Sequence, residues 1–191
     1  MTACEDSDPL ERGRRARHRT ASPDEFCGYY YPVLSRYLKS QTTDTGLAED
    51  VTADALIAAL DHWDHLLTCE RPDSWLFKVA IRKLRQLESR ARERCSLGED
   101  LASAEGDLRV AAALDTWVED HIDLVSALRS LPRRQCEVIG LHFLGGYTLH
   151  ETAEILDVTD GTVKKHLNRG LETLRQVLGA AGARRSRSVE A

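Results

Sequence analysis

One stretch decides how this chain folds: LRSLPRRQCEVIGLHFLGGYTLHETAEILDVTDGTVKKHLNRGLETLRQVL, residues 128–178. Within it, Thr148 stands three positions before Glu151, which is the spacing of a capping box at the start of a helix. A short turn, residues 157–160, then leads to a last helix, residues 161–178, with apolar residues at helical spacing. A short helix, a tight turn and a second helix with a basic first half predict a helix-turn-helix.

The last helix of this motif has a polar face opposite its apolar stripe. Val163 and Leu167 belong to the stripe, and in such motifs the N-terminal residues of the second helix enter the major groove. Arginine and lysine bond guanine edges, asparagine bonds adenine, and flanking polar side chains suit phosphates. We therefore expect DNA contacts from Thr162, Lys164, Lys165, Asn168 and Arg169.

Two more helices are predicted just before the motif. The first, residues 124–131, ends at Pro132, because a proline disfavours helical backbone in the residue before it. The second, residues 135–144, ends at two consecutive glycines, a common way for a helix to stop. Together with the helix-turn-helix they form a C-terminal helical domain, residues 124–178.

The upstream part of the chain is predicted to be a second helical domain, residues 23–95. Ser22 and Pro23 mark a helix start, and Pro32 predicts a kink or an end within that first helix. The next helix, residues 47–62, is apolar on nearly every face, which is typical of a helix inside a bundle. Its first turns carry three acids that stay in water: Glu49, Asp50 and Asp54.

A third upstream helix, which follows a loop at residues 65–73, has two unlike faces. Its apolar residues form one stripe, and at about 100° per residue its basic residues gather on the opposite side. A basic side of this kind is equally compatible with a solvated surface and with a surface that binds phosphates. The side comprises Lys78, Arg82, Arg85, Ser89 and Arg92.

Composition excludes several classes of protein. The 191 residues are 42% hydrophobic and 30% charged, as in ordinary globular proteins, and 6% aromatic residues with five prolines argue against a β-sandwich. No apolar run is long enough for membrane insertion. The net charge of −5 argues against a general nucleic-acid binder. Five widely spaced cysteines without a metal-binding or disulfide pattern favour reduced thiols in a cytoplasmic protein.

The sequence therefore predicts an all-α fold with two small helical domains. An acidic linker, residues 96–123, joins them. A polar arm, residues 1–22, and a basic tail, residues 179–191, are expected to be disordered.

Residues 128–178 resemble region four of the RNA polymerase sigma-70 family, in its extracytoplasmic-function subfamily. The elements Leu-Pro-x-Arg-Gln, Thr-x-x-Glu-x-Ala-x-x-Leu and Gly-Thr-Val-Lys stand in the family's order. Residues 47–66 and 71–94 are similar to two helices of the family's region two. The family usually has glycine where Asp157 stands, and aspartate tolerates the left-handed backbone of that turn. Other departures are the loss of a glutamine from the first region-two helix, and Arg82 and Gln86 at the family's Asn and Asp positions.

This resemblance implies a sigma factor that binds core RNA polymerase and directs it to promoter DNA. The helix over residues 47–66 would dock on polymerase through its acids, and the last helix would bind the minus-thirty-five element. An anti-sigma factor is a further partner that the resemblance suggests.

The resemblance also places minus-ten contacts on the upstream domain. The basic side of the third helix would contribute Lys78, Arg82 and Arg85. The loop over residues 65–73 would receive a base flipped from the stack, beside Trp63 and His65. For the tryptophan, a position in the core is the favoured alternative.

Two alternatives compete with this interpretation. The segment 162–167 also fits helix-turn-helix response-regulator-type transcription factors, but these carry a βαβ domain upstream, and residues 23–95 show no strand pattern. An enzyme is not expected, because the chain lacks a glycine-rich phosphate loop, HExxH and GxSxG. His62 and His65 have a spacing that suits a metal, but an exposed helix end explains them better, and neither a metal nor a cofactor is expected.

Overall fold

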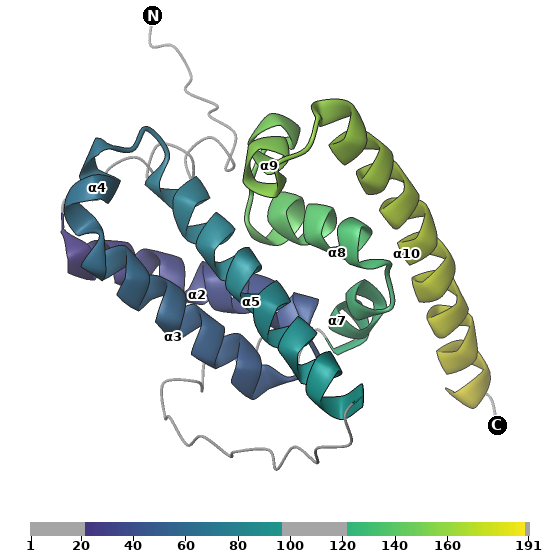
Figure 1. Cartoon of the computed structure of the whole chain (residues 1–191). Helices are drawn as coiled ribbons and strands as arrows, with labels where there is room; N and C mark the ends of the chain where they lie inside the picture. Colours follow the sequence, from purple (N-terminus) through teal and green to yellow (C-terminus); the bar gives the residue numbers. More distant parts are fainter. Residues whose placement is uncertain (1–21, 97–121, 190–191) are drawn as a thin grey trace, which may run out of the picture.

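This computed structural model describes residues 22–96 and 122–189, and its regular elements in these ranges are all helices (Figure 1). The N-terminal half contains α2 (Pro23–Gln41), α3 (Thr45–Asp61), α4 (Trp63–Thr68) and α5 (Pro72–Ser96). The C-terminal half contains α7 (Ile122–Arg129), α8 (Arg133–Ile139), η1 (Gly140–Leu144), α9 (Leu149–Leu156) and α10 (Asp160–Val189). The predicted all-α fold is confirmed. Nearly all of the predicted N-terminal arm and acidic linker lies outside the described residues.

The start of α2 agrees with the sequence, and of the two outcomes predicted at Pro32, a kink or an end, the end is excluded. The Ser22 hydroxyl accepts a hydrogen bond from the Glu25 backbone N–H at 3.2 Å, as expected of a cap. Pro32 does not end the helix, which continues to Gln41. The flanking Tyr30 and Leu34 are fully buried, and their packing holds the segment helical across the missing backbone donor.

The loop predicted at residues 65–73 is shorter than expected. Helix α4 occupies Trp63–Thr68, and α5 begins at Pro72, where a proline costs no helical hydrogen bond. Asp73 follows with no exposed surface, and Arg71 donates to both of its carboxylate oxygens at 3.1 and 3.0 Å. This short connection therefore fixes how α5 leaves the bundle.

Local signals in the C-terminal half are largely confirmed. The Thr148 hydroxyl accepts from the Glu151 N–H at 3.2 Å, and the Glu151 carboxylate accepts from the Thr148 N–H at 2.7 Å, which completes the capping box. Asp157 adopts the left-handed conformation, with φ of 56°, at the turn into α10. The helix predicted over residues 135–144 instead divides into α8 and the wider π-helical turn η1.

The basic tail, residues 179–191, was predicted to be disordered, and for residues 179–189 that prediction is wrong. Helix α10 continues through it as far as Val189. Residues 180, 181 and 183 are alanines, the best helix formers, and no proline interrupts the run.

The two halves share one hydrophobic core, which the sequence did not predict. Helix α2 lies against α7, α8 and η1, and α5 lies against α9 (Figure 1). The ring centroids of Phe77 on α5 and Tyr147 before α9 are 5.1 Å apart in an edge-on contact, and both side chains are buried. We call this contact between residues 22–96 and 122–189 the seam.

The capping box yields a stability prediction. Thr148→Ala should lower the free energy of unfolding by about 1 kcal/mol, because α9 loses a side-chain acceptor for its orphan N–H. Thr173→Ala is the matched control, since that hydroxyl only bonds the Arg169 carbonyl on an exposed face. Chemical denaturation of the two variants measures the difference, and equal stabilities would contradict a contribution from the cap.

Candidate functional site

The polar face predicted on the last helix is exposed on α10. Lys164, Lys165, Asn168 and Arg169 are exposed, whereas Val163 and Leu167 are 0% and 8% exposed. Thr162 is partly buried, and its hydroxyl lies 2.9 Å from that of Thr159 at the helix start. The structure thus presents donors from two successive turns of one helix to solvent, the arrangement that reads base edges in a major groove.

The basic side of α5 divides into two parts. Lys78, Arg82 and Arg92 are exposed, as the helical spacing predicts. Arg85 is different, because its Nε and terminal nitrogen donate to the two carboxylate oxygens of Glu137 on α8, at 3.0 and 2.7 Å. The structure therefore brings one predicted DNA contact against the other half of the chain.

The residues predicted near a flipped base do not converge. The Trp63 ring packs edge-on against Phe26 at a centroid distance of 5.5 Å and is partly buried, which is a core contact. His65 is exposed, and its Nε2 lies 3.7 Å from the Cys69 thiol.

The three acids of α3 differ in what surrounds them. Glu49 pairs with the buried Lys39 ammonium at 2.9 Å, and Asp54 pairs with Lys83 of α5. Asp50 is exposed. Farther along the same helix, Ile57 and Leu60 are 55% and 43% exposed. Large apolar side chains exposed one turn apart on a helix are typical of a surface that meets a protein partner.

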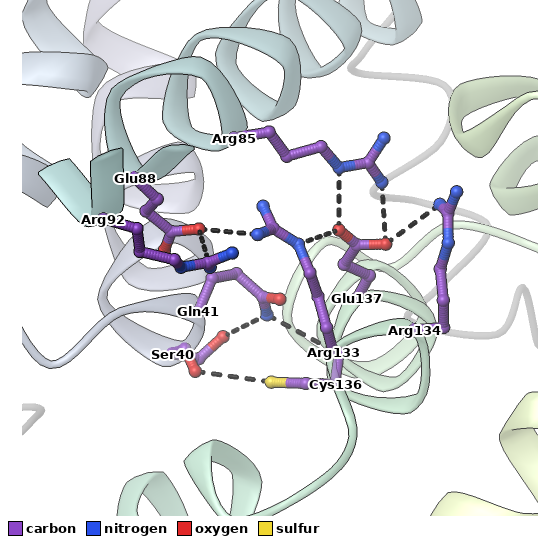
Figure 2. A network of polar contacts seen from close by, with 9 residues as sticks. All are labelled: Ser40, Gln41, Arg85, Glu88, Arg92, Arg133, Arg134, Cys136 and Glu137. Atoms are coloured by element: carbon purple, nitrogen blue, oxygen red, sulfur yellow. Dashed lines mark hydrogen bonds and ion pairs between the residues drawn. The ribbon is translucent and has the colours of Figure 1, made fainter. Parts of the chain in front are cut away.

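The polar contacts that close the seam were not predicted from the sequence. Figure 2 shows the centre of the network, where Glu137 meets arginines from α5 and from its own helix. Its carboxylate is 3% exposed, and Arg133 and Arg134 each approach it to 3.1 Å. Arg133 also reaches Glu88 of α5 at 2.6 Å. The sequence shows only that Glu137 follows Arg134 by three positions and Arg133 by four. That spacing predicts ion pairs within one helix, but it does not predict a contact with α5.

A second ion pair closes the other end of the seam. Arg71 donates to Glu151, the capping-box acid of α9, at 2.8 Å. Burial alone would lower the pKa of Arg71, but its hydrogen bond to Asp73 and the charges of Asp73 and Glu151 raise it instead. The guanidinium therefore stays charged at every accessible pH.

Hydrogen bonds to backbone carbonyls complete the contact. Arg129 donates to the Lys39 carbonyl at 2.7 Å, and the Gln41 amide donates to the Cys136 carbonyl at 3.3 Å. The Cys136 thiol donates to the Ser40 carbonyl at 3.4 Å. Burial, together with the nearby Glu137 charge, raises the pKa of Cys136 to about 12.

Within residues 22–96 and 122–189, no three His, Cys, Asp or Glu side chains gather as a metal site would require. No helix in these ranges is both long and apolar enough to cross a membrane.

Both halves of the chain are similar to known proteins. The models "Sigma-70 region 2" and "Sigma-70, region 4" match residues 27–94 and 127–176. The ECF RNA polymerase sigma factor SigL of Mycobacterium tuberculosis is 30% identical over 80% of this chain and 86% of its own length. The RNA polymerase sigma-E factor of Streptomyces avermitilis is 28% identical over 81% of this chain and 84% of its own. The solved sigma factor RpoE from Bartonella quintana, in complex with the anti-sigma factor NepR, superposes with a TM-score of 0.60 at 25% identity, over 78% of this chain and 91% of that one.

The seam predicts unequal thiol reactivity. At pH 8 a thiol with a pKa near 12 is ionised in only about one molecule in ten thousand, and Cys136 is also shielded by α2. Iodoacetamide should therefore modify the partly exposed Cys69 at least about tenfold faster than Cys136 in the native chain, and at comparable rates after unfolding in urea. Peptide mass spectrometry over a time course measures both rates, and fast native labelling of Cys136 would contradict the buried placement.

Proposed function

This chain belongs to the extracytoplasmic-function subfamily of the sigma-70 family; it directs RNA polymerase to promoters, and we propose that three of its surfaces divide that task. The observation that carries the proposal is the exposed polar face of α10 within a helix-turn-helix. The response-regulator alternative is not favoured, because the described upstream residues, 22–96, are helical and contain no strand.

The first surface, on α10, would bind the minus-thirty-five element. Arg169 and Asn168 have the donor patterns that bond guanine and adenine edges, and Lys165 lies on the same exposed face. Lys164 and Thr162 flank that face and would hold the backbone phosphates. Sequence preference and general affinity would thus come from different side chains of one helix.

The second surface, on α5, would bind the minus-ten element. Lys78 and Arg82 are free to approach phosphates in the present arrangement, and Arg85 would join them once it leaves Glu137. His65 and Trp63 would serve at a flipped base only after the packing of Trp63 on Phe26 rearranges, so Lys78 and Arg82 are the stronger candidates.

The third surface, on α3, would dock on core polymerase. Asp50 would provide the charge that steers association, and Ile57 and Leu60 would provide apolar area for the contact. Glu49 and Asp54 are already paired inside the chain, so we assign them a smaller role.

These surfaces involve binding alone. The chain would perform no covalent chemistry and would divide its binding free energy between polymerase and DNA, in the cytoplasm where both are found. An anti-sigma factor would be a further partner, by analogy with RpoE, which was solved in complex with NepR.

The assignment of α10 can be tested at the level of single bases. Arg169→Ala should lower initiation several-fold at promoters that keep the preferred upstream element, since a bidentate base contact contributes roughly 1–3 kcal/mol of discrimination. Lys164→Ala should weaken all sequences alike, as loss of a phosphate contact does. The measurement is transcription by reconstituted polymerase on templates randomised in the minus-thirty-five region. Identical sequence profiles for both variants and the parent would show that another face reads the DNA.

The polymerase surface can be tested separately from DNA. Asp50→Lys should weaken binding to core polymerase by more than about 1 kcal/mol, because repulsion replaces attraction. Glu93→Lys makes the same charge change at an exposed site on α5 and is the control. Equilibrium titration of labelled chain with core enzyme gives both affinities, and equal affinities for the two variants would rule out this docking face.

A further inference from the structure

The two halves cannot stay packed together while both promoter elements are bound. The position numbers in their names place the minus-ten and minus-thirty-five elements about 25 base pairs apart, which is roughly 85 Å of DNA at about 3.4 Å per base pair. A compact unit of about 150 residues has a radius of gyration of only about 15 Å. Because α5 and α10 lie within one such unit (Figure 1), the seam has to open before the chain can span a promoter.

The seam uses a group that the promoter would need. Arg85 donates two parallel hydrogen bonds to the two carboxylate oxygens of Glu137, at 3.0 and 2.7 Å. A phosphate accepts hydrogen bonds from arginine in the same geometry. We infer that Glu137 acts as an internal substitute for a promoter phosphate and holds the free chain in a closed, self-inhibited form. This inference rests on the proposed function of α5.

The same closure covers the helix-turn-helix. Arg71 of the N-terminal half is bonded to Glu151, in the first turn of α9. In helix-turn-helix proteins this first helix crosses the DNA backbone, so its start is covered by the N-terminal half. The closed form thus withdraws Arg85 from the α5 surface and covers the start of α9, while the outer face of α10 stays exposed.

Opening leaves Glu137 with partners, which makes the seam reversible. Removing one partner of a buried ion pair is costly when it leaves an unpaired charge in the interior. Here Arg133 and Arg134 lie on the same helix as Glu137, each at 3.1 Å, and would move with it. Separation therefore releases Arg85 for DNA without leaving the carboxylate alone (Figure 2).

The packing of the seam is also incomplete. A cavity of about 170 Å³ lies between the halves, with Tyr37 of α2 and Arg133 of α8 among its lining residues. The Tyr37 hydroxyl is buried and has no hydrogen-bond partner within the described part of the chain. Such defects weaken an interface, so the ion pairs carry more of its stability.

Gly140 gives a way to open the seam without touching a charge. A Cβ atom at this position would lie 3.0 Å from two ring carbons of Tyr37 and 2.7 Å from the Gln41 amide nitrogen, both on the opposite half. The Gln41 amide can swing aside, but the Tyr37 ring is fully buried and must give, so Gly140→Ala should strain the contact between α2 and η1 and weaken the seam. Gly179→Ala, on α10, is the matched control, because nothing lies within 4 Å of a Cβ there.

The experiment compares the full-length parent, Gly140→Ala, Glu137→Gln and Gly179→Ala. Small-angle X-ray scattering should give a larger radius of gyration for the first two variants only, and circular dichroism should show helix content retained. Cys136 should become alkylated several-fold faster in Gly140→Ala; in Glu137→Gln a neighbouring charge is also lost, so scattering alone reports opening there. At limiting protein, promoter-complex formation with core polymerase should rise by about fivefold or more, as a mostly closed population becomes mostly open.

Two results would overturn the inference. If both variants fold and scatter like the parent, Glu137 and Gly140 do not control closure. If they open the chain but leave promoter-complex formation unchanged, closure is not inhibitory. Arg82→Ala leaves the seam intact and tests the α5 assignment alone: unchanged minus-ten binding by that variant would refute the proposed function, whereas reduced binding would support it whatever Gly140→Ala does.

Discussion

A carboxylate held away from water governs how the two halves of this molecule meet. Moving an ionised carboxylate out of water costs several kcal/mol unless cations replace the lost hydration, and Glu137 is 3% exposed on its side chain. Two arginines of its own helix meet part of that need, and Arg85 of α5 meets the rest. Apolar contacts could tolerate several relative positions of the halves, but two directed hydrogen bonds to one carboxylate fix a single one.

The charge distribution follows from the same arrangement. A chain with a net charge of −5 has little general attraction for DNA, and pairing Arg85 and Arg71 with acids removes two of its cations from solution. The exposed groups on α10 still allow sequence-dependent contacts. A protein that polymerase carries to its promoter gains specificity from having few free cations, because its general affinity for DNA stays low while its sequence-dependent contacts remain.

Features that depend on residues close together in the sequence were predicted well, and features that depend on residues far apart were not. The capping box, the left-handed Asp157 and the exposed face of α10 involve residues at most a few positions apart, and all three were predicted correctly. A helix end at Pro32 and disorder up to residue 189 were predicted wrongly, because packing around Pro32 outweighs a single helix breaker and the alanines of the tail favour a helix. The Arg85–Glu137 and Arg71–Glu151 pairs join residues 52 and 80 positions apart. Helical periodicity shows which face is buried but not against what, so one shared core and two separate cores give the same pattern.

The glycine at position 140 also bears on how such a protein can diverge. It lies outside the exposed faces of α3, α5 and α10, yet its lack of a side chain leaves room for the Tyr37 ring and the Gln41 amide of the other half. One small substitution here could change the proportion of closed and open molecules in the free protein, while every side chain that reads DNA or docks on polymerase stayed the same. Output level and target choice would then evolve independently, because they reside in different residues.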